Sequence, residues 1–242
     1  MVSSWQVIES GRLSAEAIMG KDAFLLSQLT VNSPPFLHFY EWESPCLTYG
    51  YFTDPIPFLD IEAVEYCGLQ MARRPTGGGI IFHLTDLAFS VLVSASHPYF
   101  SLNTLENYAF INQRVAEAIR HLTTQSMRPD LLPLEPSCSS KNCKAFCMAK
   151  PTQYDLILDG KKVGGAAQRR TRQGLLHQAS LSLLFPPLDL LRKVLKDHER
   201  VLKSMREHSY CLLPGCSTVQ DLQEMRDQLK ELLKISFAEL IA

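Results

Sequence analysis

The sequence predicts an α+β fold in which a largely antiparallel sheet is flanked by helices. Segments rich in aromatic and β-branched residues follow one another with short connections, which favours antiparallel strand pairing. Amphipathic segments precede, interrupt and follow these strands, so helices are expected to cover the sheet. With 242 residues, 46% of them hydrophobic, the chain is long enough to bury a full core.

Composition excludes several classes of protein. The 24 basic and 25 acidic residues give a net charge of −1, so no overall positive field is available to bind nucleic acid. The start of the chain lacks the pattern of a secretory signal, and no run reaches the roughly 18 apolar residues of a membrane span. Seven cysteines, an odd number, fit reduced thiols better than disulfides. We therefore expect a cytoplasmic protein that binds neither nucleic acid nor membranes.

The first expected element is a helix over residues 14–29. Its apolar stripe also carries Asp22, and a buried carboxylate needs a partner, so a structural ion pair or cap is favoured over a catalytic role. The apolar members of the stripe are Ile18, Met19, Leu25, Leu26 and Leu29.

The remaining elements follow in order, without an internal repeat or a linker, so residues 1–242 are expected to form one domain. An amphipathic helix is expected over 104–122, and two helices are expected at the C-terminal end. The last of these begins with a capping-box pattern of Ser217 and Gln220. Strands are expected over 36–42, 46–50, 69–74, 87–95, 154–159 and 175–185.

Residues 127–151 lack periodicity and contain four prolines, which predicts a long loop. Loops of this length in compact domains are usually functional or disordered. Three of the seven cysteines, Cys138, Cys143 and Cys147, lie in this loop.

The segment RRPTGGGIIFH, residues 73–83, combines positive charge with unhindered backbone. The amides of Gly77, Gly78 and Gly79 can approach a carboxylate, phosphate or thioester carbonyl closely, because glycine has no Cβ. Arg73 and Arg74 add donors for an anion, which favours a binding loop over a simple β-bulge or hairpin turn. His83 is expected to line the pocket or the core rather than to act as a base.

A second glycine-containing turn, DGKKVGGAAQ over residues 159–168, carries two adjacent lysines. Side chains alternate along a strand, so Lys161 and Lys162 are expected to face opposite ways. One of the two lysines is therefore expected to point into a site and the other to be solvated.

Four blocks together resemble the biotin/lipoate protein ligase superfamily, which includes lipoate-protein ligase A and octanoyltransferases: RRPTGGGIIFH, LTDLAFSV, YDLILDGKKVGGAAQ and LLHQASL. The resemblance implies a mixed, largely antiparallel sheet flanked by helices, similar to biotin ligase and class II synthetase cores. It implies that Lys162 contacts the acyl carbonyl or a phosphate. It also implies a substrate-binding set of Arg73, Arg74, Gly77, Gly78, Gly79, His83, Gly165, Ala167 and His177.

The stretch FCMAKPTQYDL, residues 146–156, resembles the block in which one octanoyltransferase class carries a nucleophilic cysteine. Cys147 takes that position, and nearby lysines would favour its thiolate. Two other interpretations remain open for Cys147. It is either an inert thiol or, with Cys138 and Cys143, a zinc ligand, although the irregular spacing and lack of a fourth ligand disfavour zinc.

The resemblance implies an enzyme that attaches an octanoyl or lipoyl group to a lysine of a lipoyl carrier domain, through a Cys147 thioester and without a cofactor. The carriers implied are the lipoyl domains of 2-oxoacid dehydrogenase complexes or the glycine cleavage H protein, and acyl carrier protein is a possible donor. The alternative chemistry is an ATP- and Mg²⁺-dependent lipoate ligase in which Cys147 is dispensable. No metal is expected in the transferase.

Three further expectations concern other parts of the chain. The tail is too short for a large C-terminal accessory domain. The segment His177, Gln178, Ala179 departs from the usual His-Gly pattern of the family, which leaves open a catalytically silent relative that only binds a carrier or an acyl group. The cluster RRTR, residues 169–172, is the best candidate for a basic surface that meets an anionic carrier.

Overall fold

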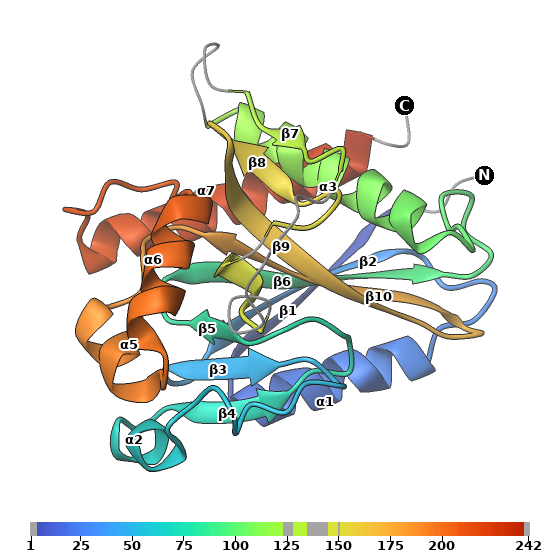
Figure 1. The fold of residues 1–242 in the computed structure, drawn as a ribbon. Coiled ribbons are helices and arrows are strands. Elements are labelled where there is room, and N and C mark those ends of the chain that lie inside the picture. The colour runs from blue at the N-terminus through green and yellow to red at the C-terminus, as the bar shows by residue number, and fades with distance from the viewer. Residues whose placement is uncertain (1–3, 123–127, 135–144, 150, 240–242) are drawn as a thin grey trace.

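The computed structural model describes residues 4–122, 128–134, 145–149 and 151–239. Two sheets form its centre, and they lie one beside the other (Figure 1). The larger sheet has seven strands, in the spatial order β1 (Gln6–Leu13), β2 (Phe36–Trp42), β6 (Asp86–Ser94), β10 (Gly174–Ser182), β9 (Lys161–Arg170), β8 (Leu156–Leu158) and β7 (Asp130–Leu131). The smaller sheet has the order β4 (Gln70–Arg73), β3 (Cys46–Tyr49) and β5 (Ile81–His83).

The predicted α+β class is confirmed, because the larger sheet is antiparallel throughout except for the parallel pair β1 and β2. The expectation that successive strands pair antiparallel is wrong for β2, β3 and β4. Strand β2 pairs with β6, whereas β3 belongs to the smaller sheet and runs parallel to β4. A parallel pair requires a crossover, and α2 (Ile61–Tyr66) lies within that crossover.

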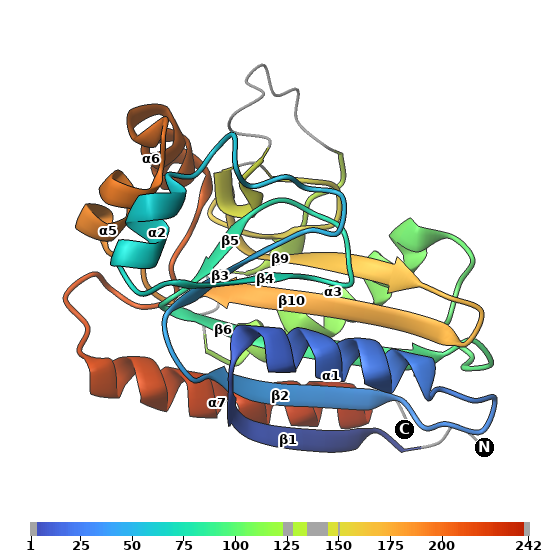
Figure 2. The same cartoon turned by 90° about the horizontal axis from the view of Figure 1, so that it is seen from below.

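Helices cover both faces of the larger sheet. Helices α3 (Thr104–Arg120) and α7 (Val219–Ala238) pack on one face, where residues such as Ile111 and Leu229 join the core of Phe39 and Phe89. Helix α1 (Ala15–Ser27) lies on the other face and runs along β2 in the view from below (Figure 2). Because its residues Ile18 and Met19 contact both sheets, α1 holds the two sheets together.

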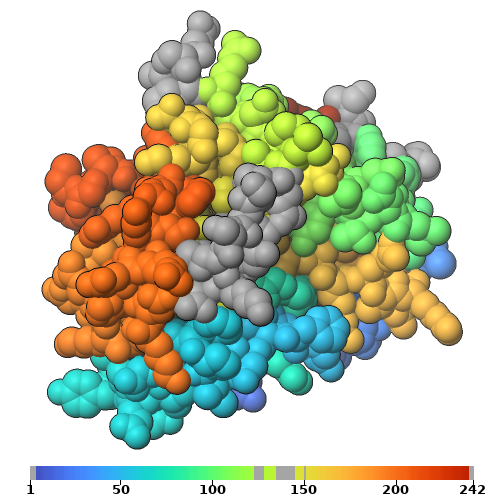
Figure 3. Space-filling view, viewed as in Figure 1, coloured from blue at the N-terminus to red at the C-terminus, as the bar shows by residue number. Residues whose placement is uncertain are grey.

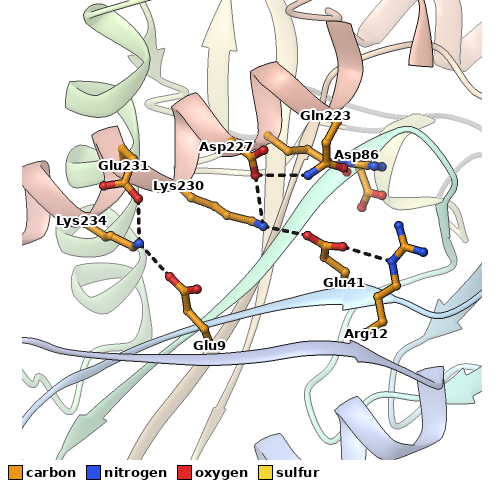
Figure 4. Close-up of polar contacts among 10 residues, drawn as sticks. Glu9, Arg12, Glu41, Asp86, Gln223, Asp227, Lys230, Glu231 and Lys234 are labelled. Atoms are coloured by element: carbon orange, nitrogen blue, oxygen red, sulfur yellow. Dashed lines mark hydrogen bonds and ion pairs between the residues drawn. The ribbon is translucent and has the colours of Figure 1, made fainter. Parts of the chain in front are cut away.

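Helix α7 is attached to the edge of the larger sheet by ion pairs (Figure 4). Lys230 Nζ lies 3.1 Å from Glu41 of β2, and Lys234 Nζ lies 2.7 Å from Glu9 of β1. The capping box of α7 is real but begins one residue later than predicted. Thr218 caps the helix, and the carboxylate of Asp221 accepts from the Thr218 N–H. The predicted pair of Ser217 and Gln220 is therefore wrong.

The smaller sheet packs against a separate helical layer of α2, α5 (Leu188–Val194) and α6 (His198–His208). Two C-terminal helices were expected, but residues 186–239 contain three, because the segment before α7 bends between α5 and α6. This layer also buries Phe146, which precedes the short 3-10 turn η1 (Cys147–Ala149), and Met148 within that turn. None of the described helices has the length and apolar character needed to cross a membrane.

Asp22 of α1 is fully buried and paired, as its place on the apolar stripe predicted. Its carboxylate accepts hydrogen bonds from His38 Nδ1 at 2.7 Å, Ser90 Oγ at 2.6 Å and Gln178 Nε2 at 2.6 Å. These three donors come from β2, β6 and β10, so Asp22 fixes α1 on the face of the sheet.

Candidate active site

A cavity of about 410 Å³ lies where the two sheets meet α1. Its apolar wall includes Met19 of α1 and Trp42 of β2. Its polar wall includes Arg74, Cys147 and Lys162, which are far apart in the sequence. An elongated apolar chain with a polar or reactive end fits such a lining.

The glycine segment brings Cys147 to this polar wall. Ile80 N–H donates to Ala145 O at 2.6 Å, and Cys147 N–H donates back to Ile80 O at 3.0 Å, so residues 145–147 lie along the start of β5. As a result the Gly79 N–H donates to Cys147 Sγ, with N and S 3.2 Å apart. The Arg74 guanidinium approaches the same sulfur at 4.0 Å. An N–H and a cation aimed at one sulfur interact more favourably with a thiolate than with a thiol.

Arg74 is only 5% exposed and shapes the glycine segment from inside. Its Nη2 donates to the carbonyls of Gly77 at 3.0 Å and Gly79 at 2.6 Å. Its Nη1 donates to Thr48 Oγ1 at 2.8 Å, on the neighbouring strand β3. Arg74 therefore turns the carbonyls of this loop inward, which leaves the Gly79 N–H facing the sulfur.

A chain of buried, hydrogen-bonded side chains extends from Arg74 through Thr48 to His83 and Asp86. Thr48 Oγ1 lies 2.8 Å from His83 Nε2, and His83 Nδ1 lies 2.6 Å from Asp86 Oδ2. Burial alone would raise the pKa of Asp86, but His83 and the hydroxyl of Ser180 outweigh burial and lower it. His83 lines the cavity, yet both of its nitrogens are engaged. This agrees with a pocket-lining histidine rather than a free base.

Lys162 and Lys161 point in opposite directions along β9. The Lys162 side chain is 4% exposed, and its Nζ lies 2.6 Å from Asp155 Oδ2 and donates to Cys147 O at 2.9 Å. Thr152 holds Asp155 in place through its N–H at 2.6 Å and its hydroxyl at 2.8 Å. Lys161 Nζ lies outside the cavity, 3.4 Å from Arg206 O.

The structure brings together eight of the eleven predicted site residues and leaves three apart. The eight that line the cavity are Arg74, Gly78, Gly79, His83, Cys147, Lys162, Gly165 and Ala167. Gly77 is not part of the cavity lining, but its carbonyl accepts a hydrogen bond from Arg74, which is. Arg73 is exposed and lies over the Tyr51 ring at 4.5 Å.

His177 lies on the opposite face of β10 from the cavity, against Tyr108 and Gln168. Burial lowers the pKa of His177 to about 3, so this side chain stays neutral. Its neighbour Gln178 takes the cavity side, where it joins Asp22 to Thr76 Oγ1. No sequence motif singled out Gln178 or Thr48 as a site residue. Strand alternation in LLHQASL was the signal that would have found Gln178.

The zinc interpretation of the cysteines involves two residues, Cys138 and Cys143, that lie outside the described residues. Within the described ranges, no group of three or more His, Cys, Asp or Glu side chains is arranged to hold a metal ion.

Replacing Gly79 by alanine is expected to disrupt the site, whereas the same change at Gly77 is expected to be tolerated. A Cβ on Gly79 would meet the carbonyl of Ala145 far inside van der Waals contact, and backbone cannot move away cheaply. A Cβ on Gly77 meets nothing within 4 Å. We expect Gly79→Ala to slow alkylation of Cys147 and lower the melting temperature by several degrees. Equal melting temperatures and equal thiol reactivity for the two variants would contradict the close packing of Gly79 on Ala145.

The chain is similar to known proteins in its sequence and in its fold. The sequence profile of the lipoyl protein ligase A/B catalytic domain matches residues 15–234. The chain is 35% identical over 207 residues to octanoyltransferase LipM of Anoxybacillus flavithermus (strain DSM 21510 / WK1), covering 84% of this chain and 74% of the relative. It is 31% identical over 207 residues to octanoyltransferase LipM of Bacillus subtilis (strain 168), covering 85% of this chain and 74% of the relative.

Two solved structures share the fold. A putative lipoate protein ligase from T. acidophilum with bound lipoic acid has a TM-score of 0.73 at 22% identity, covering 99% of this chain and 86% of that chain. A lipoate-protein ligase A bound with ATP has a TM-score of 0.72 at 23% identity, covering 100% of this chain and 86% of that chain. By its sequence and its fold, the chain belongs to the lipoyl protein ligase A/B catalytic domain family.

Proposed function

We propose that the protein transfers an octanoyl or lipoyl group to the lysine of a lipoyl carrier domain, with Cys147 as the intermediate acyl acceptor. The observation that carries this proposal is the Gly79 N–H directed at Cys147 Sγ, on the polar wall of a cavity whose other wall is apolar. The names of the relatives, octanoyltransferase, support the same reaction.

The proposed reaction has two steps. The Cys147 thiolate attacks the carbonyl carbon of an acyl thioester, and the resulting tetrahedral oxyanion collapses by expelling the donor thiolate. The ε-amine of the carrier lysine then attacks the carbonyl carbon of the Cys147 thioester. The C–S bond breaks, the amide forms, the Cys147 thiolate is released, and the proton lost by the amine passes to the solvent. Donors fixed near the oxyanion lower both barriers, and we assign this role to the glycine amides and Lys162.

The cations in the cavity favour transfer over adenylate chemistry. The guanidinium of Arg74 donates to two loop carbonyls and to Thr48, and the ammonium of Lys162 is paired with Asp155. A triphosphate would have to compete with Asp155 for Lys162, and the two anions would repel each other. The proposed transfer between thioesters needs no ATP.

The test is an acylation assay of an apo lipoyl domain, followed by intact-protein mass spectrometry. With an octanoyl thioester donor and no ATP, we expect octanoylated domain and a transient octanoyl adduct on the enzyme. Product formed only from free lipoate with ATP and Mg²⁺ would instead establish the ligase alternative. No mass gain under either condition, with folded protein, would indicate a silent relative.

A further inference from the structure

The rim of the cavity carries an exposed aromatic and basic surface, which we name the rim patch: Tyr51, Phe52, Arg73 and Arg169. Phe52 is 92% exposed and Tyr51 is 43% exposed. The guanidinium of Arg73 lies 4.5 Å from the centre of the Tyr51 ring, and that of Arg169 lies 5.7 Å from it. Two cations therefore meet at one exposed aromatic ring.

The rim patch is attached directly to the walls of the cavity. Tyr51 N–H donates to Thr76 O at 2.8 Å, and Thr53 Oγ1 donates to Gly78 O at 2.8 Å. Arg169 Nη1 lies 3.4 Å from Pro75 O. Thr53 and Gly78 line the cavity, so a molecule bound on the rim patch lies beside its mouth. In the space-filling view, the light-blue surface around residue 50 adjoins the gold surface around residue 170 (Figure 3).

Within the described part of the chain, no carboxylate forms an ion pair with the arginines of the rim patch. The ion pairs there involve neither Arg73 nor Arg169, and both side chains are exposed. Exposed aromatic and arginine side chains close together are typical of the energetically important centre of a protein interface. The chain as a whole has a net charge of only −1, so the positive charge of the patch is local.

We propose that the rim patch docks the acceptor carrier domain through an acidic face that surrounds its target lysine. The proposal rests on the proposed function, which requires a protein-bound lysine to reach Cys147 in both its transferase and its ligase form. A lysine that approaches Arg73 and Arg169 meets like charges, and carboxylates beside that lysine offset this repulsion. The patch therefore selects among lysines by the acidic residues around them.

This proposal differs from the expectation for RRTR taken as a whole. Arg170 points back to the carbonyl of Leu102 rather than toward Tyr51. Of that cluster, only Arg169 reaches the rim patch, and Tyr51, Phe52 and Arg73 come from two other segments of the chain. The surface is thus assembled by the fold and does not coincide with a run of basic residues.

The experiment measures binding and each half-reaction separately. An apo lipoyl domain is titrated by calorimetry, at low and high salt, into the Cys147→Ala protein and into the same protein carrying Phe52→Ser, Arg169→Glu or Arg200→Ala. The acylation of Cys147 by octanoyl-pantetheine, a donor without a protein part, is then followed by mass spectrometry in the wild type and in Phe52→Ser and Arg169→Glu. Transfer from the octanoylated enzyme to the lipoyl domain is measured in the same three proteins.

We expect Phe52→Ser and Arg169→Glu each to weaken binding of the lipoyl domain about tenfold and to raise its KM to match. The rate of Cys147 acylation by octanoyl-pantetheine should not change. Arg169→Glu should also reduce the salt dependence of binding. The matched control is Arg200→Ala, an exposed arginine on α6, which should leave binding unchanged.

Wild-type affinity in both rim variants, or an equal loss in Arg200→Ala, would overturn the proposal. Absence of measurable binding to the wild-type surface would overturn it as well. If binding depends on the rim patch but no acyl group reaches the domain, the docking surface stands and the proposed function fails. The two proposals are therefore tested separately.

Discussion

Replacing Cys147 by alanine is expected to lower acyl transfer to a lipoyl domain by at least about three orders of magnitude, because the nucleophile of a covalent mechanism is removed. The fold is expected to survive, since the change removes one sulfur atom from a half-buried residue that faces the cavity. The measurement is the initial rate of octanoyl transfer from a thioester donor, with circular dichroism as the check on folding.

Cys67 provides a matched control for Cys147. It is a half-buried free thiol that follows α2, away from the cavity lining. Cys67→Ala should transfer at the wild-type rate, and the mass of the enzyme's octanoyl adduct should appear in Cys67→Ala but not in Cys147→Ala. Normal turnover in Cys147→Ala would rule out a thioester intermediate on the enzyme. The remaining mechanism would be direct attack of the carrier lysine on an activated acyl group.

The parts of the site that the sequence predicted are those encoded within single segments. The amides of Gly77–Gly79 are accessible in any fold, because glycine has no Cβ. Side-chain alternation along a strand places Lys161 and Lys162 on opposite faces, whatever the rest of the fold. The structure places Lys162 3% exposed at the cavity and Lys161 outside it. Residues such as Thr48 were not predictable in this way, because its contact with Arg74 depends on the parallel pairing of β3 with β4.

The parts of the fold that were missed have weak local signals. Strand β1 lies at the sheet edge, and all eight of its residues are at least partly exposed, so its sequence lacks the alternation of a half-buried strand. The division into two sheets depends on pairings between distant segments, such as β2 with β6. Local sequence patterns do not indicate which distant segments pair. His177 was expected at the cavity, but its neighbour Gln178 lies there instead. The two differ because adjacent residues of a strand face opposite sides of the sheet.

The second large effect is expected at Lys162. Lys162→Ala should lower kcat by roughly two to three orders of magnitude, as when one preorganised donor to an oxyanion is removed. Because Lys162 is buried against Asp155 at 2.6 Å, the change also leaves a carboxylate without its cation. Breaking such a buried pair costs about 3–5 kcal/mol, and the two hydrogen bonds from Thr152 to Asp155 should keep the loss near the lower end.

A second variant separates loss of chemistry from loss of stability. Lys162→Ala combined with Asp155→Asn removes both charges, and we expect its unfolding free energy to recover most of the loss while its kcat remains as low as in Lys162→Ala. Lys161→Ala is the matched control and should keep both its stability and its kcat, because its ammonium lies outside the cavity. Recovery of kcat in the double variant would show that Lys162 only neutralises Asp155. A dead Lys161→Ala beside an active Lys162→Ala would contradict the register of β9.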